Sequence, residues 1–407
     1  MASTKIYNMI FSVRLLSFGY IFILCSLLSC SHDKSPARLE QGSSDNPRSS
    51  FKPISDEPKV SNSSLTETTS FILNFPSKSR FRSIPWRDLP GFNETPTSAL
   101  WSALLDHCEK PHPIWSFSCS QKRPLSLSDD QEQRIWILTQ LQAFSVETSD
   151  GEDNGLLTSY YEPVFKASLS QRDSFNYPIY APPPSLVASK KLGQAWFSRK
   201  EIETSPLLQK ELQSQIIAWL EDPLEVMILH VQGSARLQIE SPNAQALEYR
   251  VGFAASNDLP YQSMAKWMLD QGLTKDASWA GIKSALQKNP DKEKDAYWSN
   301  PRYIFFTLSP LNDTSKGPKG SWGKPLKAHL SIAVDPKSIP LGLPLWLSSE
   351  GSTRFQQLVL SEDTGNAING SVRADYFAGT GAQAGEFANK IKQNLKLWVL
   401  LPRNATP

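Results

Sequence analysis

The chain has 407 residues, 40% of them hydrophobic, so it can bury a substantial core and is long enough for two domains. Its 42 basic and 40 acidic residues give a formal net charge of +2, which offers no basic excess for a nucleic-acid partner. Only Lys5 and Arg14 are charged before Ser31, so a chain that began at Ser31 would carry 40 basic and 40 acidic groups.

Residues 1–29 resemble a secretory signal peptide, with Lys5 and Arg14 as its basic region. The apolar run 15–28 is short for a transmembrane helix. Leu27-Leu28-Ser29-Cys30 then resembles a bacterial lipobox, so we expect Cys30 to be lipidated and to anchor the chain to the membrane. Ser31 at the next position favours the outer membrane. An uncleaved anchor helix is the alternative.

Residues 30–70 are rich in Ser, Pro, Asp and Lys and poor in large apolar side chains, which predicts a flexible tether. Two cysteines remain after processing, Cys108 and Cys119. In an oxidising periplasm they can close a disulfide, and two buried free thiols are the alternative.

The rest of the chain alternates short strand-like and helical segments. Hydrophobic spacing predicts helices at 129–144, 208–220 and 261–269, a buried strand at 224–231 and a half-buried strand around 237–239. Further strands are expected at 303–308, 329–334, 343–347, 357–361 and 395–400. Short strands separated by Gly and Pro turns favour a mainly β protein with two lobes built from β-barrels.

Several classes of site find no support. The five histidines show no metal-ligand spacing, and no Cys-x-x-Cys pair is present. The glycines of segment 317–324 have the wrong spacing for a phosphate-binding loop, and Gly233-Ser234 lacks the second glycine of a nucleophile elbow. We therefore expect neither a metal nor a cofactor.

The segment 361–381 is the most informative part of the chain. It sets Asp363 and Asp375 among four glycines, directly after the strand-like segment 357–361. Glycines let the backbone turn tightly and approach a ligand, and acids on loops held by a sheet commonly perform acid–base chemistry. Any single aspartate of this kind could equally cap a turn or a helix.

The whole segment resembles the aspartate-rich signature of the MltA family, the membrane-bound lytic murein transglycosylases A. Five further blocks follow the family's order, namely 155–163, 230–236, 249–261, 300–306 and 331–342. Ser159, Ala235 and Asn366 depart from it, since the family commonly has glycine there.

The resemblance implies a fold and a reaction. The fold would be mainly β, with a double-psi β-barrel from residues 71–165 and 299–407, an inserted smaller β-barrel from residues 166–298, and a groove between them. The reaction would cleave the β-1,4 bond between N-acetylmuramic acid and N-acetylglucosamine in peptidoglycan glycan strands, leaving 1,6-anhydromuramic ends. The sequence names no wall-synthesis partner. A non-catalytic peptidoglycan-binding lipoprotein and a two-carboxylate hydrolase remain as alternatives.

The resemblance also assigns site residues. Asp375 would be the catalytic acid, and Asp363 a supporting acid that orients its loop or raises the pKa of Asp375. Substrate binding would involve two barrel segments and the segment 232–234, whose residues are Thr158, Tyr160, Tyr161, Gln232, Gly233, Ser234 and Arg373. Barrel packing is the alternative for the tyrosine pair, and a β-bulge at the end of a strand is the alternative for 232–234.

Overall fold

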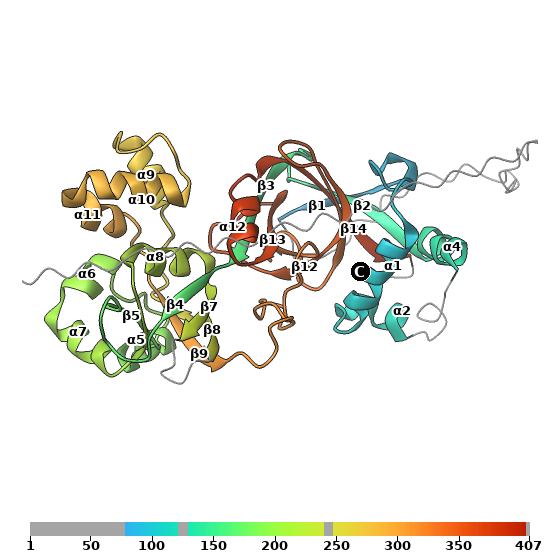
Figure 1. Cartoon of the computed structure of the whole chain (residues 1–407). Coiled ribbons are helices and arrows are strands. Elements are labelled where there is room, and N and C mark those ends of the chain that lie inside the picture. The colour runs from blue at the N-terminus through green and yellow to red at the C-terminus, as the bar shows by residue number, and fades with distance from the viewer. Residues whose placement is uncertain (1–77, 121–128, 240–246, 404–407) are drawn as a thin grey trace, which may run out of the picture. The chain divides into compact units, whose positions relative to one another are not determined.

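A computed structural model describes residues 78–120, 129–239 and 247–403 (Figure 1). The predicted signal peptide, tether and lipidated Cys30 lie outside these residues. Within the described ranges, no helix is both long enough and apolar enough to cross a membrane.

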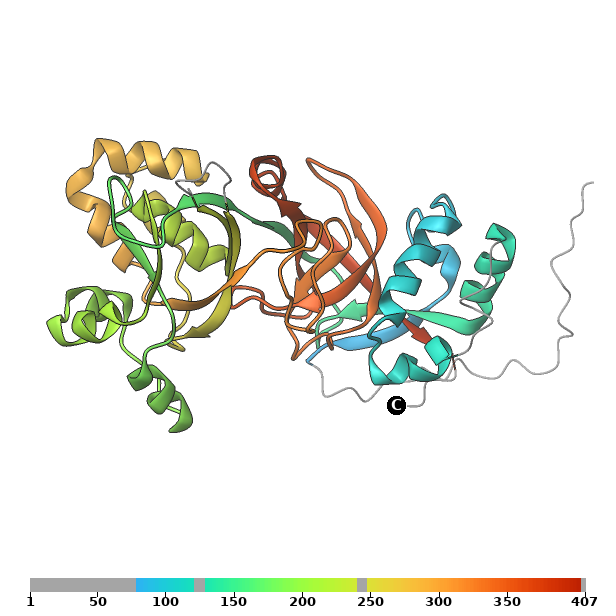
Figure 2. The same cartoon turned by 60° about the horizontal axis from the view of Figure 1, so that its bottom comes forward.

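Eight strands form the first sheet, in the order β1-β2-β14-β11-β12-β10-β13-β3. Because β14 also pairs with β3, the six strands from β14 to β3 close into a ring, seen in Figure 1 and from a turned direction in Figure 2. Closure leaves no free sheet edge in this ring. The strands are β1 Arg80–Ile84, β2 Leu141–Glu147, β3 Gly155–Glu162, β10 Ser331–Val334, β11 Pro344–Ser349, β12 Phe355–Asp363, β13 Arg373–Thr380 and β14 Lys392–Pro402.

Large apolar side chains from these strands fill one core. Trp346 and Tyr376 are almost completely buried in it, together with Leu157 and Leu397. Every residue of β11 is buried, which explains why that segment reads as a continuous apolar run rather than as an alternation. Helices accompany the sheet, namely α1 Thr97–Cys108, α2 Ser116–Ser120, α4 Asp130–Gln140 and α12 Ala382–Ala388, with short 3-10 turns at Trp86–Asp88 and Pro113–Trp115.

The chain between β3 and β10 forms a second sheet and the helices around it. The sheet contains β4 Val164–Ala167, β7 Ser234–Ile239, β8 Leu247–Ser256 and β9 Ile304–Pro310, and an isolated bridge from Ser168 to Trp219 links it to the pair β5 Tyr177–Tyr180 and β6 Ile216–Leu220. The chain leaves the first sheet after β3 and returns after β9. The predicted return at residue 299 therefore precedes the last strand of the second sheet.

Helices surround this second sheet and bury a core of their own. They are α5 Pro184–Lys191, α6 Arg199–Thr204, α7 Pro206–Gln213, α8 Pro223–Gln232, α9 Met264–Asp270, α10 Trp279–Lys288 and α11 Glu293–Trp298, with a 3-10 turn at Pro290–Lys292. The inserted part thus contains more helix than its strand-like segments suggested, while the mainly β class of the fold is confirmed by its two sheets and its structural relatives.

The predicted strand at 224–231 is wrong, because this segment forms helix α8. Asp222 caps the helix, its carboxylate accepting the Leu224 amide at 2.8 Å, and Pro223 occupies the first turn. Gly233 ends the helix in a left-handed conformation at φ +78°. A continuous apolar run cannot by itself distinguish a buried strand from a buried helix, and here the flanking capping residues decide.

Two predicted helices are too long. The helix expected at 208–220 ends at Gln213 and is followed by strand β6, and the helix expected at 129–144 ends at Gln140. Phe144 instead pairs with Ser83 of β1 and with Val399 of β14. The residues after Gln140 and those from Ile216 onwards form strands, because strand pairing and burial outweigh a weak helical pattern in the sequence. The helix expected at 261–269 and the other predicted strands are confirmed, with shifted ends.

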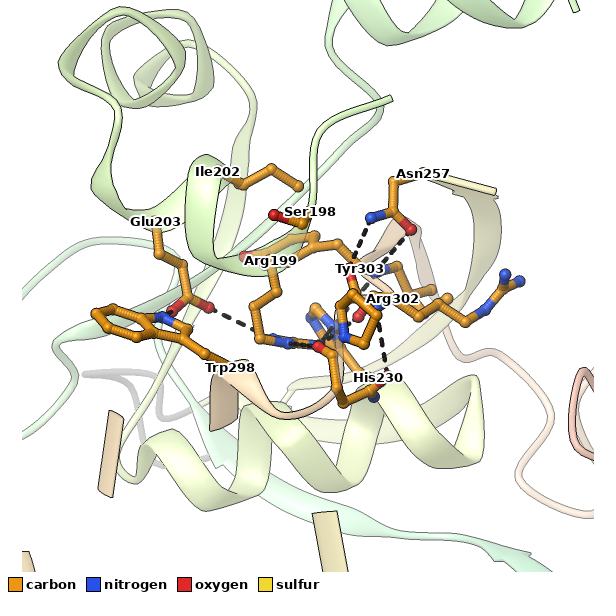
Figure 3. A network of polar contacts seen from close by, with 12 residues as sticks. Ser198, Arg199, Ile202, Glu203, His230, Asn257, Trp298, Arg302 and Tyr303 are labelled. Atoms are coloured by element: carbon orange, nitrogen blue, oxygen red, sulfur yellow. Dashed lines mark hydrogen bonds and ion pairs between the residues drawn. The ribbon is translucent and has the colours of Figure 1, made fainter. Parts of the chain in front are cut away.

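A buried polar network holds the inserted helices together (Figure 3). The Arg199 guanidinium donates to the carbonyls of Asn300 and Arg302 and contacts His230 Nδ1 at 2.8 Å, while its charge lies 4.8 Å from the Tyr303 ring centroid. Burial, and then the charge of Arg199, lower the pKa of His230 well below its usual range. His230 is therefore a neutral packing residue that links α8 to β9.

The alternatives for the two cysteines are resolved in favour of a disulfide. Cys108 ends α1 and is bonded to Cys119 in α2, with 5.3 Å between their Cα atoms.

Candidate active site

The barrel brings the two predicted acids to one place. Asp363 ends β12 and Asp375 lies in β13, and both strands flank β10, where Ala333 is the register partner of each acid. The expectation that Asp375 lies on a glycine-rich loop is wrong, since it is a strand residue that pairs with Thr158 of β3. A strand position fixes its backbone more firmly than a loop does.

Asp375 is held in surroundings that favour its protonated form. Its side chain is largely withdrawn from solvent, and the Thr158 hydroxyl donates to its Oδ1 at 2.5 Å. Burial raises the pKa of Asp375, the Thr158 hydrogen bond and the Arg373 charge oppose that rise, and the charge of Asp363 adds to it. A carboxyl group with a raised pKa can act as a proton donor nearer neutral pH.

Thr158 contacts the acid directly, and Arg373 contacts Thr158. Arg373 Nη2 donates to Thr158 Oγ1 at 2.8 Å, and its Nη1 donates to the Leu156 carbonyl at 3.2 Å. Because the threonine oxygen accepts from the arginine, its own proton points to Asp375. In this arrangement the two residues orient the acid, and their predicted contacts with a substrate remain a prediction.

Asp363 is an acceptor with three donors. Its Oδ1 receives the Ser321 amide at 3.0 Å and the Ser321 hydroxyl at 2.9 Å, while Oδ2 receives the Tyr160 hydroxyl at 2.8 Å. Burial and then the charge of Asp363 raise the pKa of Tyr160 well above its usual range, so this phenol stays a donor. Only about one of the roughly four acceptor positions of a carboxylate is then left unused.

Ser321 is the residue that sequence reasoning missed. It lies in the glycine-rich segment 317–324, whose glycine spacing does not fit a phosphate-binding loop. The Trp322 amide donates to the carbonyl of Glu362 at 2.8 Å, so this segment lies directly beside Asp363. The clustering of glycines around Ser321 was the available signal, because it marks backbone that can approach another segment closely.

Tyr161 lies on the opposite face of β3 from Tyr160, as strand alternation requires. Its ring packs on α12, where a side chain at Gly385 would come within 2.9 Å of the ring carbons. This contact favours the packing alternative for Tyr161. Its backbone amide donates to Gln232 Oε1 at 3.2 Å, which connects β3 of the barrel to the end of α8 in the insert.

The segment 232–234 ends a helix rather than a strand, which corrects the prediction. Gln232 is the last residue of α8, Gly233 is the left-handed cap, and Ser234 begins β7 opposite Gly252. The helix cap, and not a β-bulge, explains the glycine. The structure thus brings Gln232 to β3, while contacts of Gly233 and Ser234 with a glycan remain predictions.

Asp335 shapes the loop between β12 and β13, the two strands that carry the predicted acids. Its carboxylate accepts the amides of Lys337 and Gly370, both at 2.9 Å. Gly370 has φ +110°, a conformation that favours glycine. Within the described ranges, no group of three or more His, Cys, Asp or Glu side chains is placed to hold a metal.

Comparison with known proteins gives two family matches. Residues 156–307 match the MltA specific insert domain, and residues 330–401 match the 3D domain. Membrane-bound lytic murein transglycosylase A of Escherichia coli K12 is 29% identical over 274 residues, covering 64% of this chain and 69% of that protein.

Solved structures agree with these matches. The lytic transglycosylase LtgG of Burkholderia pseudomallei is 33% identical, with a TM-score of 0.53 over 80% of this chain and 96% of its own. MltA of Neisseria gonorrhoeae is 26% identical, with a TM-score of 0.66 over 83% and 96%. E. coli MltA with bound chitohexaose has a TM-score of 0.62 at 22% identity over 85% and 99%, a likeness of fold. The chain with this paired-aspartate barrel belongs to the MltA family of lytic transglycosylases.

Proposed function

We propose that this chain cleaves the β-1,4 bond between N-acetylmuramic acid and N-acetylglucosamine in peptidoglycan, with Asp375 as the only acid–base group. Protonated Asp375 donates its proton to the glycosidic oxygen as the bond from that oxygen to C1 breaks. The 6-hydroxyl of the muramic residue then bonds to C1 and releases its proton to the Asp375 carboxylate. The acid is regenerated, and no water is consumed.

The different surroundings of the two acids carry this proposal. Asp375 has burial that favours its neutral form and one hydroxyl donor. Asp363 accepts three hydrogen bonds, two from Ser321 and one from Tyr160. This division suits one proton-transferring acid and one supporting charge, whose proximity raises the pKa of the first.

The two alternatives fit these contacts less well. A hydrolase would need Asp363 to activate a water molecule, yet about three of the roughly four acceptor positions of this carboxylate already serve Ser321 and Tyr160. A non-catalytic binding protein would have no need of a carboxyl group whose pKa is raised by its surroundings in the barrel.

Two substitutions test the assignment. General acid–base catalysis contributes roughly 10²–10⁴-fold to a rate, so Asp375→Asn should lose about that much turnover of purified sacculi while still binding glycan. Asp363→Asn should lose less, because its proposed role is support. Both variants are compared at equal folded fraction by thermal unfolding. An inactive Asp363→Asn beside an active Asp375→Asn would reverse the two roles.

We also propose that the chain is exported and held at the periplasmic face of the outer membrane by lipid on Cys30. The lipobox-like segment and the membrane-bound relatives support this proposal. We further propose that the glycan binds in a groove between barrel and insert. The sheet pairings support domain limits near residues 163 and 316 rather than 166 and 299.

A further inference from the structure

Glu162 is a completely buried carboxylate at the point where the chain leaves the barrel. It is the last residue of β3 and is followed by Pro163 and by β4 of the second sheet. Burying a charge costs free energy unless hydrogen bonds or opposite charges compensate for the lost hydration. The contacts of Glu162 therefore indicate its structural role.

Its partners come from both sheets. From the second sheet, Arg236 Nε of β7 donates to Oε2 at 2.8 Å and Arg250 Nε of β8 donates to Oε1 at 2.7 Å. From the barrel, the Thr380 hydroxyl at the end of β13 donates to Oε2 at 2.8 Å, and the Gly381 amide donates to the Glu162 carbonyl. One side chain therefore joins the catalytic strand β13 to the insert.

The same arginines also hold the returning chain. Arg236 Nη2 and Arg250 Nη2 both donate to the Lys316 carbonyl, at 3.3 and 2.5 Å. Lys316 lies between β9 and the segment that carries Ser321, the partner of Asp363. Both passages between barrel and insert thus meet at one ion cluster, which we call the crossing cluster: Glu162, Arg236, Arg250, Thr380 and the Lys316 carbonyl.

Three of the predicted glycan contacts, Tyr161, Gln232 and Ser234, are close to the crossing cluster along the chain. Tyr161, whose amide binds Gln232, precedes Glu162 directly, and Ser234 lies two positions before Arg236. A shift of β7 against β3 would therefore move Gln232 and Ser234 relative to Asp375 without changing the acid itself.

We propose that Glu162 is a positioning residue that fixes the insert against the barrel and so sets the distance between the glycan contacts of the insert and Asp375. The inference rests on the proposed function. Without the carboxylate, Arg236 and Arg250 would be two neighbouring, largely buried cations with no anion between them, and their repulsion would loosen the crossing. We therefore expect weaker glycan binding and an unchanged rate of the proton-transfer step.

The test is Glu162→Gln, with Glu147→Gln as matched control. Glu147 of β2 is another buried carboxylate of the first sheet, and its arginine partner is Arg82 of β1 at 2.6 Å, which is not part of the crossing cluster. Binding of chitohexaose is titrated for each substitution in an Asp375→Asn background, so that turnover does not interfere. KM and kcat on sacculi are measured with Asp375 intact.

Glu162→Gln should weaken chitohexaose binding and raise KM by roughly tenfold, the scale of losing one or two hydrogen-bonded contacts, with kcat changed by no more than about twofold. Glu147→Gln should leave both unchanged at a similar loss of thermal stability. Adding Arg250→Gln to Glu162→Gln should restore part of the binding, because it removes one of the two repelling cations.

Unchanged binding and KM in Glu162→Gln, or a loss confined to kcat, would overturn the inference. A failure of the proposed function looks different. In that case the chain with its native Glu162 and Asp375 would release no anhydro ends or would not bind chitohexaose. The positioning role of Glu162 would then be contradicted together with the proposed function.

Discussion

At the scale of single residues, the site depends on the different surroundings that the barrel gives to two aspartate side chains. Asp363 and Asp375 occupy strands on either side of β10, but Asp363 accepts three hydrogen bonds and Asp375 accepts one from a side chain. Environment, rather than residue type, assigns the roles of base, acid and support in such pairs.

The raised pKa of Asp375 makes a prediction about pH. Because the folded state favours the protonated form, the stability linked to this group is complete below its unfolded pKa and is lost as pH rises through the folded pKa. An amide does not ionise, so Asp375→Asn should melt at a higher temperature than the unsubstituted protein at pH 8, and the difference should shrink towards pH 4. A constant difference across this range, measured by thermal unfolding, would contradict the raised pKa.

Both acids could be predicted from the sequence because the aspartate-rich segment is contiguous. Ser321 could not, since its contact with Asp363 joins positions 42 residues apart and follows no periodic pattern. Glu162 was hidden for the same reason: its arginines lie 74 and 88 residues further along the chain. Only the closed sheet brings such partners together.

At the scale of elements, capping residues distinguish a helix from a strand where the hydrophobic pattern fits both. The run 224–231 is apolar almost throughout, and only Asp222, Pro223 and Gly233 at its ends mark it as a helix. The correction matters for the site, because Gln232 is the last residue of a helix and not part of a strand. Its side-chain oxygen accepts the Tyr161 amide of β3.

Gln232 supports a prediction at this scale. Its Oε1 accepts from the Tyr161 amide, which leaves its amide nitrogen to donate to a glycan carbonyl. Gln232→Ala should weaken chitohexaose binding by up to roughly tenfold, the loss of about 0.5–1.5 kcal/mol expected for one hydrogen bond to an uncharged ligand. Isothermal titration measures this. Gln209→Ala, at an insert glutamine whose side chain donates to the Ile202 carbonyl, is the control, and equal affinity in both variants would remove Gln232 from the site.

At the scale of the whole molecule, the sequence supports two lobes and a mainly β class. The barrel with an insert came only with the family resemblance, and the order of the strands only with the structure. The ring of six strands joins β3 to β13 and β14, which are separated by the entire insert. Pairings between distant segments carry no local signal, so composition and periodicity could not reveal them.

Attachment to a membrane is a prediction for the whole chain. Three acyl groups on Cys30 would suffice for stable anchoring, since one chain alone binds only weakly. Cys30→Ala should therefore release the full-length protein from washed membranes into the soluble fraction and abolish metabolic palmitate labelling. A substituted protein that stays in the membrane fraction would indicate an uncleaved anchor helix instead.

The central claim is that the muramic 6-hydroxyl, and not water, attacks C1, and the mass of the products tests it most directly. Purified protein is incubated with purified sacculi, and the released muropeptides are analysed by mass spectrometry, with Asp375→Asn as the inactive control. The account predicts products that are lighter by one water than hydrolytic muropeptides and that resist borohydride reduction. Reducible products of full hydrolytic mass would contradict it and would identify a two-carboxylate hydrolase.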